Sequence, residues 1–137
     1  MLSNSMTFTN VSEHEVRVAF DPDGTAWYCC IDIAGLVGYK AHDKVISHIL
    51  NCEKSLSAEI RQISWVNTKG RFKRNFCNHI RCFDEKNTLE FFERTAVENE
   101  AVRWFTYEVI PAAKQRGMEI AKENGMLHNP ISSPKKP

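Results

Sequence analysis

The chain has 137 residues, 42% of them hydrophobic, and a formal net charge of +1 at pH 7. This length is enough for one well-packed core and too short for two ordinary domains. No apolar run approaches the roughly 20 residues of a membrane-spanning helix, so we expect no contact with a membrane. The net charge favours no class of partner, but residues 60–83 hold six basic and no acidic side chains, whereas residues 1–59 hold four basic and eight acidic ones.

The N-terminal part of the sequence predicts a flexible segment followed by a hairpin. Residues 1–11 are rich in Ser, Thr and Asn, which is typical of a flexible N-terminus. Apolar residues alternate from Glu15 to Phe20, as in a strand with one buried face. Asp21-Pro22-Asp23-Gly24 has the Pro and Gly positions of a type I turn, so Thr25 to Cys29 is predicted to return as the second strand.

Two short helices are predicted next, in a helix-turn-helix-like pair. Ile33, Leu36 and Val37 recur at helical spacing, and Gly38 can adopt the left-handed conformation that ends a helix. A second apolar stripe, between Val45 and Leu50, has an opposite face whose side chains can donate to phosphates or base edges. These polar residues are Lys44, Ser47, His48 and Asn51. The spacing also fits an αα-hairpin with a solvated polar face.

A second hairpin is predicted from Ile60 to Asn67 and from Phe72 to Phe83, with a turn at 68–71. A basic two-stranded ribbon that also carries aromatic residues can follow a phosphate backbone or enter a groove. Lysines that protect an exposed sheet edge are the alternative explanation. Six basic residues without an acid exceed that need and favour nucleic-acid contact. The basic residues of this segment are Arg61, Lys69, Arg71, Lys73, Arg74 and Arg81.

The C-terminal part predicts two helices and a tail. The first runs from Asp84 to Val97 with Asn87 as its N-cap. We expect it to bury Leu89, Phe92 and Ala96. The second starts near Glu98 and continues to Glu123, and Pro111 should kink or restart it, because proline has no N–H to bond the carbonyl four residues earlier. Its predicted buried residues are Ala101, Val102, Phe105 and Val109. Residues 125–137, with three prolines and two lysines, predict a disordered tail.

The cysteines were tested as metal ligands. Cys77-x-His79-x-x-Cys82 contains ligand-type residues and Cys52 could add a fourth, but the paired spacings of zinc sites are missing. The chain has five cysteines and no secretory leader, so we expect free thiols in the cytoplasm and no metal or other cofactor. No nucleophile, phosphate-loop, dinucleotide or zinc-protease motif occurs, so no enzyme activity is predicted. A nuclease site in the basic hairpin remains as an alternative.

Two segments of the sequence resemble the amino-terminal domain of the BRO (baculovirus repeated open reading frame) family. The first is Val16 to Lys40, which contains Trp27-Tyr28, Asp32-Ile33-Ala34 and Gly38-Tyr39 in the order of the family. The second is AVRWFTYEVIPAAKQRG, Ala101 to Gly117, which is similar to the family helix F-x-x-W-[VI]-x-x-E-V-[LI]-P-x-[IL]-R-x-x-G. Together the two segments bracket about a hundred residues, so the resemblance covers nearly the whole chain.

The resemblance implies a DNA-binding regulatory module of residues 12–124, as in phage antirepressors and large DNA viruses. We expect an α+β fold in which a small antiparallel sheet of hairpins packs against about four helices. The expected partner is double-stranded DNA, bound by a homodimer that reads paired half-sites in a bacterial host's cytoplasm. A stand-alone inhibitor that binds a host repressor or defence protein is the alternative. The predicted DNA-binding residues are Lys40, Lys44, Ser47, Arg61, Lys69, Arg71, Lys73, Arg74 and Arg81.

Overall fold

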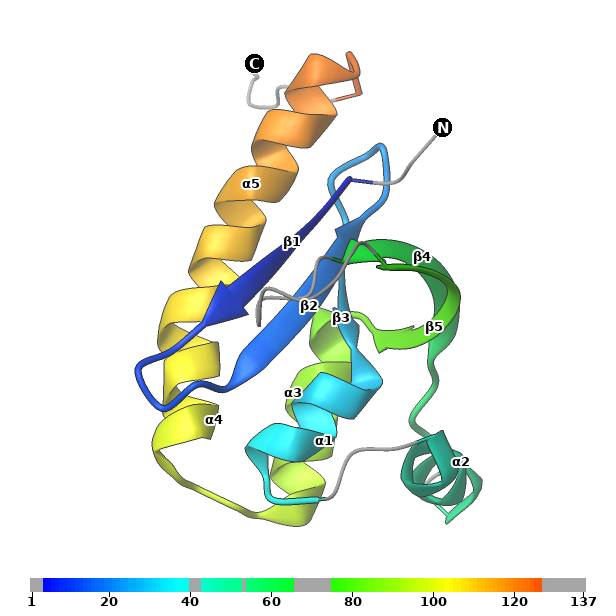
Figure 1. The fold of residues 1–137 in the computed structure, drawn as a ribbon, viewed down its shortest axis with the longest axis vertical. Coiled ribbons are helices and arrows are strands. Elements are labelled where there is room, and N and C mark those ends of the chain that lie inside the picture. Colours follow the sequence, from blue (N-terminus) through cyan, green and yellow to red (C-terminus); the bar gives the residue numbers. More distant parts are fainter. Residues whose placement is uncertain (1–3, 40–42, 53, 66–74, 127–137) are drawn as a thin grey trace, which may run out of the picture.

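The computed structural model describes residues 4–39, 43–52, 54–65 and 75–126 (Figure 1). Within them, five strands form one antiparallel sheet in the order β1-β2-β3-β5-β4. The strands are β1 (Asn4–Thr9), β2 (Glu15–Phe20), β3 (Ala26–Cys29), β4 (Glu59–Trp65) and β5 (Asn75–Phe83). The helices are α1 (Cys30–Leu36), α2 (Asp43–Cys52), α3 (Glu85–Thr95), α4 (Glu100–Trp104), the π-helical η1 (Phe105–Val109) and α5 (Ile110–Glu123).

The predicted α+β fold is confirmed. Because α4, η1 and α5 follow one another without a gap, the described residues hold four continuous helical segments beside the antiparallel sheet. The first hairpin, its turn and the helix that ends before Gly38 all lie close to their predicted positions, and Gly38 has the expected positive φ of 99°. In the described part of the chain, every helix is too short or too polar to traverse a lipid bilayer.

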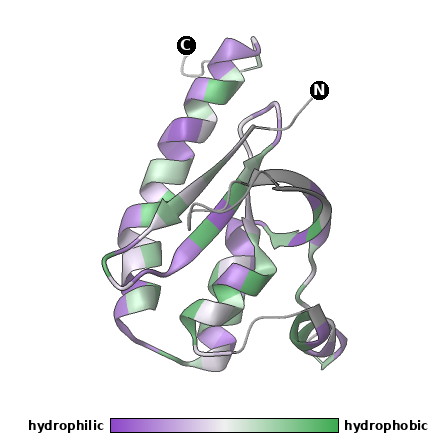
Figure 2. Cartoon of the chain, in the orientation of Figure 1, coloured by the Kyte–Doolittle hydropathy of each residue, from purple (hydrophilic) through white to green (hydrophobic). Residues whose placement is uncertain are grey.

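The main core lies between the sheet and the helices and is dominated by aromatic rings. Strand β2 alternates hydrophobic and hydrophilic residues along its length, so one of its faces can be buried (Figure 2). The ring of Tyr28 on β3 meets that of Phe105 edge-on at 4.9 Å, and Phe105 meets Phe92 of α3 in the same way at 5.6 Å. Phe91 of α3 packs against Phe83 of β5 at 5.8 Å. These contacts join the strands, α3 and η1 into one core.

The other face of the sheet encloses a smaller cluster of small side chains. Ala19, Cys29 and Cys82 are buried there, with Trp27 and Ile80 packed around them. The sheet curls so strongly on this side that β4 approaches β1 and β2, which are not its hydrogen-bonded neighbours (Figure 1). A β-bulge between β4 and β5, where the pairing shifts near Arg61, adds to this bend. Small side chains suit the narrow space inside the curl.

The expectation of a flexible N-terminus is wrong for residues 4–9. These residues form β1, which pairs with β2 from Asn4 opposite Phe20 to Thr9 opposite Glu15. Met6 and Phe8 alternate with threonines and pack against the main core. The burial of these two side chains therefore favours a strand over the disorder that the polar composition indicated.

Two details of α3 also differ from the prediction. The N-cap is Asp84 rather than Asn87, because the Asp84 carboxylate accepts the backbone N–H of Asn87 at 2.8 Å. The helix buries Thr88 and Phe91 together with Phe92, while Leu89 is 39% exposed. The buried face is therefore rotated from the one that the apolar pattern predicted. The predicted tail, residues 125–137, lies outside the described residues after 126.

The long C-terminal helix passes Pro111 through a π-helical turn. The N–H of Ile110 bonds the carbonyl of Phe105, five residues earlier, and Pro111 stands at the start of α5. A proline cannot donate to the ladder, so the preceding turn widens and the helix continues beyond it. Here the predicted irregularity is confirmed, and so is the burial of Ala101, Val102, Phe105 and Val109.

The turn of the first hairpin is pressed directly against α5. Gly24 donates its N–H to the carbonyl of Asp21 at 2.8 Å and has a φ of 92°. A Cβ atom on Gly24 or on Gly117 of α5 would overlap the carbonyl oxygen of the other glycine. Asn124 also donates a side-chain hydrogen bond of 3.1 Å to the carbonyl of Pro22. The two backbones approach this closely because neither glycine has a side chain.

We predict that Gly117→Ala destabilises the protein by about 2 kcal/mol, although alanine favours helix, because the added methyl group overlaps the Gly24 backbone. Gly35→Ala in α1 is the matched control, since the position that its methyl group would take has no neighbouring atom within 4 Å. This control should gain about 0.5 to 1 kcal/mol from helix propensity. Urea unfolding of both variants measures the difference. Equal effects of the two substitutions would contradict the close approach.

Candidate functional site

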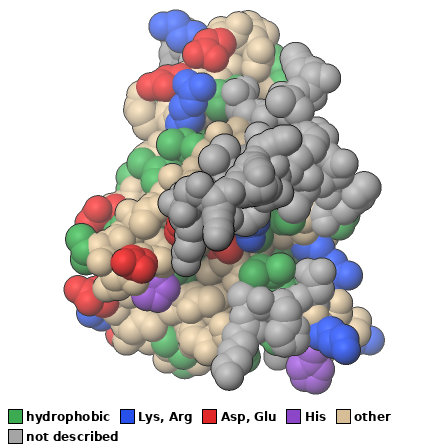
Figure 3. Space-filling view, in the orientation of Figure 1, with side chains coloured by type: hydrophobic (Ala, Val, Ile, Leu, Met, Phe, Trp, Pro, Cys, Tyr) green, Lys and Arg blue, Asp and Glu red, His purple; other side chains and the backbone are tan. Residues whose placement is uncertain are grey.

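Helix α2 and strand β5 share one surface. Arg81 of β5 donates a hydrogen bond of 2.8 Å from Nη1 to the hydroxyl oxygen of Ser47 on α2, and both residues belong to the predicted DNA-binding set. Lys44 and His48 are exposed and lie one helical turn from each other, on the same side of α2 as Ser47. Figure 3 shows basic and histidine side chains gathered around α2. The structure thus brings the polar face of α2 and Arg81 near the end of β5 together.

The opposite side of α2 holds the helix on the domain. Ile46 and Ile49 are buried in the main core, and Val45 and Leu50 pack against it. Figure 2 shows the hydrophobic side of α2 turned toward the rest of the molecule and the hydrophilic side turned outward. The apolar stripe that predicted this helix is confirmed, and its polar face is left accessible.

Arg61, another residue of the predicted set, has partners within the protein. Its guanidinium bonds both carboxylate oxygens of Asp21, at 3.0 and 3.2 Å, and reaches Glu59 at 3.1 Å. It also lies 4.1 Å from the centroid of the Trp27 ring, whose N–H bonds Asp21 at 2.9 Å. These contacts connect β4 to the first hairpin. We therefore assign Arg61 to the stability of the fold and leave it out of the candidate interface.

The remaining predicted residues cannot be placed on this surface. Lys40, Lys69, Arg71, Lys73 and Arg74 lie outside the described residues, so their role stays a prediction from sequence.

A buried ion pair that the sequence did not reveal fixes the start of α1. Arg17 of β2 bonds Asp32 through Nε at 2.9 Å and through Nη2 at 3.2 Å. The Asp32 carboxylate also accepts the backbone N–H of Arg17 at 2.9 Å, and Cys29 accepts a weaker bond from the guanidinium. Both side chains are about 85% buried. The Asp32 carboxylate, in the first turn of α1, thus anchors the helix to β2.

The described cysteines are free and fall into two environments. Cys29, Cys30 and Cys82 are buried, whereas Cys52 is exposed on α2 beside His48. Burial raises the pKa of the Cys29 thiol to about 12, and it also raises the pKa of Cys30 and Cys82 well above the usual value. No group of three or more potential metal ligands occurs among the residues that the structure describes.

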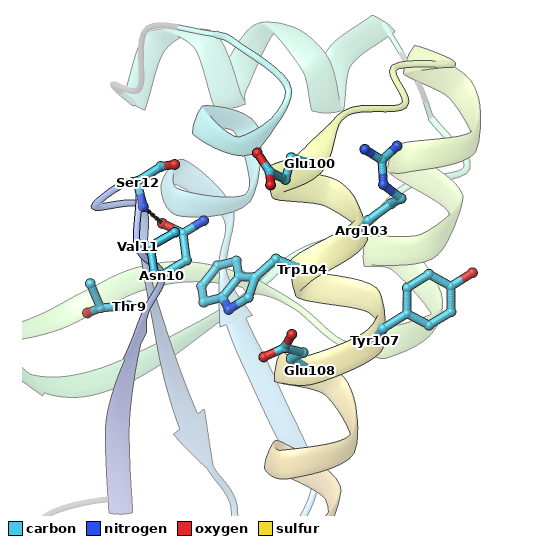
Figure 4. Close-up of a pocket in the computed structure, with 9 residues that line it drawn as sticks. All are labelled: Thr9, Asn10, Val11, Ser12, Glu100, Arg103, Trp104, Tyr107 and Glu108. Atoms are coloured by element: carbon cyan, nitrogen blue, oxygen red, sulfur yellow. Dashed lines mark hydrogen bonds between the residues drawn. The ribbon is translucent and has the colours of Figure 1, made fainter.

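The described residues also form a groove that the sequence did not predict. It has a volume of about 460 Å³ and lies between the β1–β2 turn, residues 9–12, and the helix formed by α4 and η1. The helix contributes Glu100, Arg103, Trp104, Tyr107 and Glu108. Figure 4 shows Trp104 facing the turn, with the carboxylates of Glu100 and Glu108 on either side of the indole. The groove and α2 lie on different sides of the molecule (Figure 1).

Comparison with known proteins gives no relative. No family model, no curated protein and no solved structure matches this chain. Function is therefore inferred from the geometry described above and from the sequence itself.

We predict that Arg61→Gln lowers the free energy of unfolding by about 1 to 2 kcal/mol, because it removes two carboxylate partners and the contact with the indole ring. Arg81→Gln is the matched control and should change stability by no more than about 0.5 kcal/mol, since its bond to Ser47 is exposed. Urea unfolding tests both. An Arg61 variant as stable as the parent would return this residue to the candidate interface.

Of Cys29, Cys30, Cys52 and Cys82, only the exposed Cys52 should react with iodoacetamide in the folded protein at neutral pH, because the reagent must reach the thiol and the thiolate is the reactive form. Peptide mass spectrometry identifies the labelled residues. Labelling of Cys29, Cys30 or Cys82 without denaturant would contradict their burial.

The same thiols predict a loss of stability at alkaline pH. The pKa values of these thiols are higher in the folded protein than the value near 9 that they have in the unfolded chain. The stability that the buried neutral thiols contribute is therefore complete below pH 9, and it is lost as the pH rises toward their pKa values in the folded protein. The free energy of unfolding should therefore fall above pH 9, and the slope should be less steep in Cys82→Ala than in the parent. Cys52→Ala should retain the parent's slope. Identical slopes for the Cys82 variant and the parent would argue against this linkage.

Proposed function

We propose that the protein binds double-stranded DNA through the surface formed by α2 and β5. The observation that supports this proposal is the hydrogen bond from Arg81 to Ser47, which joins the polar face of α2 to a basic residue of β5. Helix α2 has ten residues and is therefore about 15 Å long. The diameter of an α-helix, roughly 10 to 12 Å with side chains, matches the major groove, which is about 12 Å wide.

The chemistry of the surface suits this partner. Lys44 supplies a mobile ammonium group for phosphate contact, and Arg81 retains further N–H donors after its bond to Ser47. The Ser47 hydroxyl accepts that bond and keeps its own hydrogen to donate to a phosphate or a base edge. His48 and Asn51 are exposed on the same face and can extend the contact along the groove.

A regulatory role follows from the resemblance to the BRO amino-terminal domain, in which DNA binding belongs to phage and viral regulators. The basic residues Lys69, Arg71, Lys73 and Arg74 would add phosphate contacts from the segment between β4 and β5. The protein would then combine helix readout with electrostatic attachment.

Salt-dependent DNA binding is the direct test. We predict that the double variant Lys44→Ala with Arg81→Ala flattens the slope of log K against log salt by about 0.9 per lost phosphate contact. Lys86→Ala with Lys122→Ala is the matched control, because it removes the same charge from exposed residues of α3 and α5. Fluorescence anisotropy with a labelled duplex at several salt concentrations measures both. If the two double variants bind alike at every salt concentration, α2 and β5 are not the interface.

A second set of variants separates the parts of the proposed surface. The quadruple alanine variant at Lys69, Arg71, Lys73 and Arg74 should lose salt-dependent affinity on any duplex. Ser47→Ala should cost on the order of 1 to 3 kcal/mol on a selected site and far less on random DNA, if α2 reads bases. Absence of duplex binding by the parent at low salt would instead favour the protein-binding inhibitor.

A further inference from the structure

The groove beside the β1–β2 turn has a rigid wall. The Asn10 side-chain oxygen accepts the backbone N–H groups of Ser12 and His14, each at 2.9 Å. The Asn10 backbone also exchanges hydrogen bonds with Glu13 and His14, and Glu13 adopts a left-handed φ of 66°. The turn is thereby held in one conformation opposite the helix. A preformed wall reduces the entropy that a bound group must lose.

The helix wall carries charge that is not neutralised within the described residues. Glu100 and Glu108 make no ion pair there, and their carboxylates flank the indole of Trp104 (Figure 4). Arg103 and Tyr107 extend away from the turn on the outer rim of the groove. The Trp104 ring is partly buried against the main core and also lines the groove. Two carboxylates beside such a ring attract a cation that can lie on its accessible part and bond the carboxylates. The π-helical η1 starts directly after Trp104, and such helical irregularities are frequent at functional sites.

We propose that this groove binds an arginine side chain of a partner protein. A guanidinium group is planar, stacks on an indole face and presents several donors to carboxylates, so it matches Trp104 with Glu100 and Glu108 better than an ammonium group does. The groove is thus a peptide-binding site on a different side of the molecule from the proposed DNA interface, and it is independent of that proposal.

The surroundings of the groove favour a peptide over a free small cation. Val11, at the tip of the turn, is 97% exposed, and Tyr107 on the opposite rim is 73% exposed. Both residues line the groove together with Trp104, so exposed apolar surface continues from the indole to the two rims. A peptide with apolar residues next to its arginine would cover them.

The test uses the full chain and a capped pentapeptide with a central arginine between two leucines. Nuclear magnetic resonance titration at low salt should shift the backbone signals of residues 9–12 and the indole N–H of Trp104. The same peptide with citrulline, which has the shape of arginine without its charge, should bind on the order of fivefold more weakly, because two carboxylate contacts lose their charge partner. A lysine peptide should fall between the two.

The double variant Glu100→Gln with Glu108→Gln should weaken binding of the arginine peptide by a similar factor and leave binding of the citrulline peptide unchanged. Glu93→Gln with Glu98→Gln is the matched control: these exposed residues lie outside the groove, and the change in net charge is the same. Equal binding of the arginine and citrulline peptides, equal loss in both double variants, or no shift at millimolar peptide would each overturn the proposal. Duplex DNA binding by all these variants is measured in parallel and should be unaffected.

Discussion

The Asp32 carboxylate stabilises the junction at which the chain leaves strand β3 and enters helix α1. Strand β3 ends at Cys29 and α1 begins at Cys30, with no loop between them. The pairing of β2 with β3 ends at Val18 and Tyr28, and the Asp32 carboxylate accepts the backbone N–H of the preceding residue, Arg17. The guanidinium of Arg17 then neutralises the carboxylate in a site that is largely withdrawn from water. Removal of one partner would leave a buried charge, which is far more costly than loss of an exposed ion pair.

The direction of α1 determines where the later elements can lie. Helix α1 packs its Ile33 and Leu36 into the core and ends at a glycine, after which α2 adds Ile46 and Ile49 to the same core. Because α2 is held by one apolar stripe and by the bond from Arg81 to Ser47, its position depends on α1 and on β5. The surface that α2 forms with β5 is therefore a consequence of the junction between β3 and α1.

Local features of the fold could be predicted from sequence, and contacts between distant residues could not. The Asp21–Gly24 turn, the stop at Gly38 and the stripe of α2 each depend on a few consecutive residues. In contrast, Arg61 meets Asp21 forty residues away, so the sequence around this predicted DNA-binding residue gives no sign of its partner within the fold. Residues 4–9 were likewise missed as a strand, because their composition is polar. They form β1 through pairing with β2, and the sequence of residues 4–9 alone does not show that partner.

The candidate site shows the same division. Lys44 and Ser47 were identified because their face of α2 is polar, whereas the contact between Ser47 and Arg81 required the folded sheet. The groove could not be found at all, since the turn at residues 9–12 and Trp104 are about ninety positions apart. The sequence shows acidic residues at the start of α4, including Glu100. Such residues are favourable at the N-terminus of any helix because of the helix dipole, so they do not indicate a groove.

The contact between Gly24 and Gly117 has a consequence for the order of folding in the cell. Gly24, in the turn between β2 and β3, is synthesised 93 residues before Gly117, so this turn cannot dock until α5 has emerged from the ribosome. Until then, the apolar face of the hairpin remains uncovered by α5. Contacts of such large sequence separation also slow folding. A chaperone that shields the nascent hairpin would therefore be expected to raise the yield of folded protein.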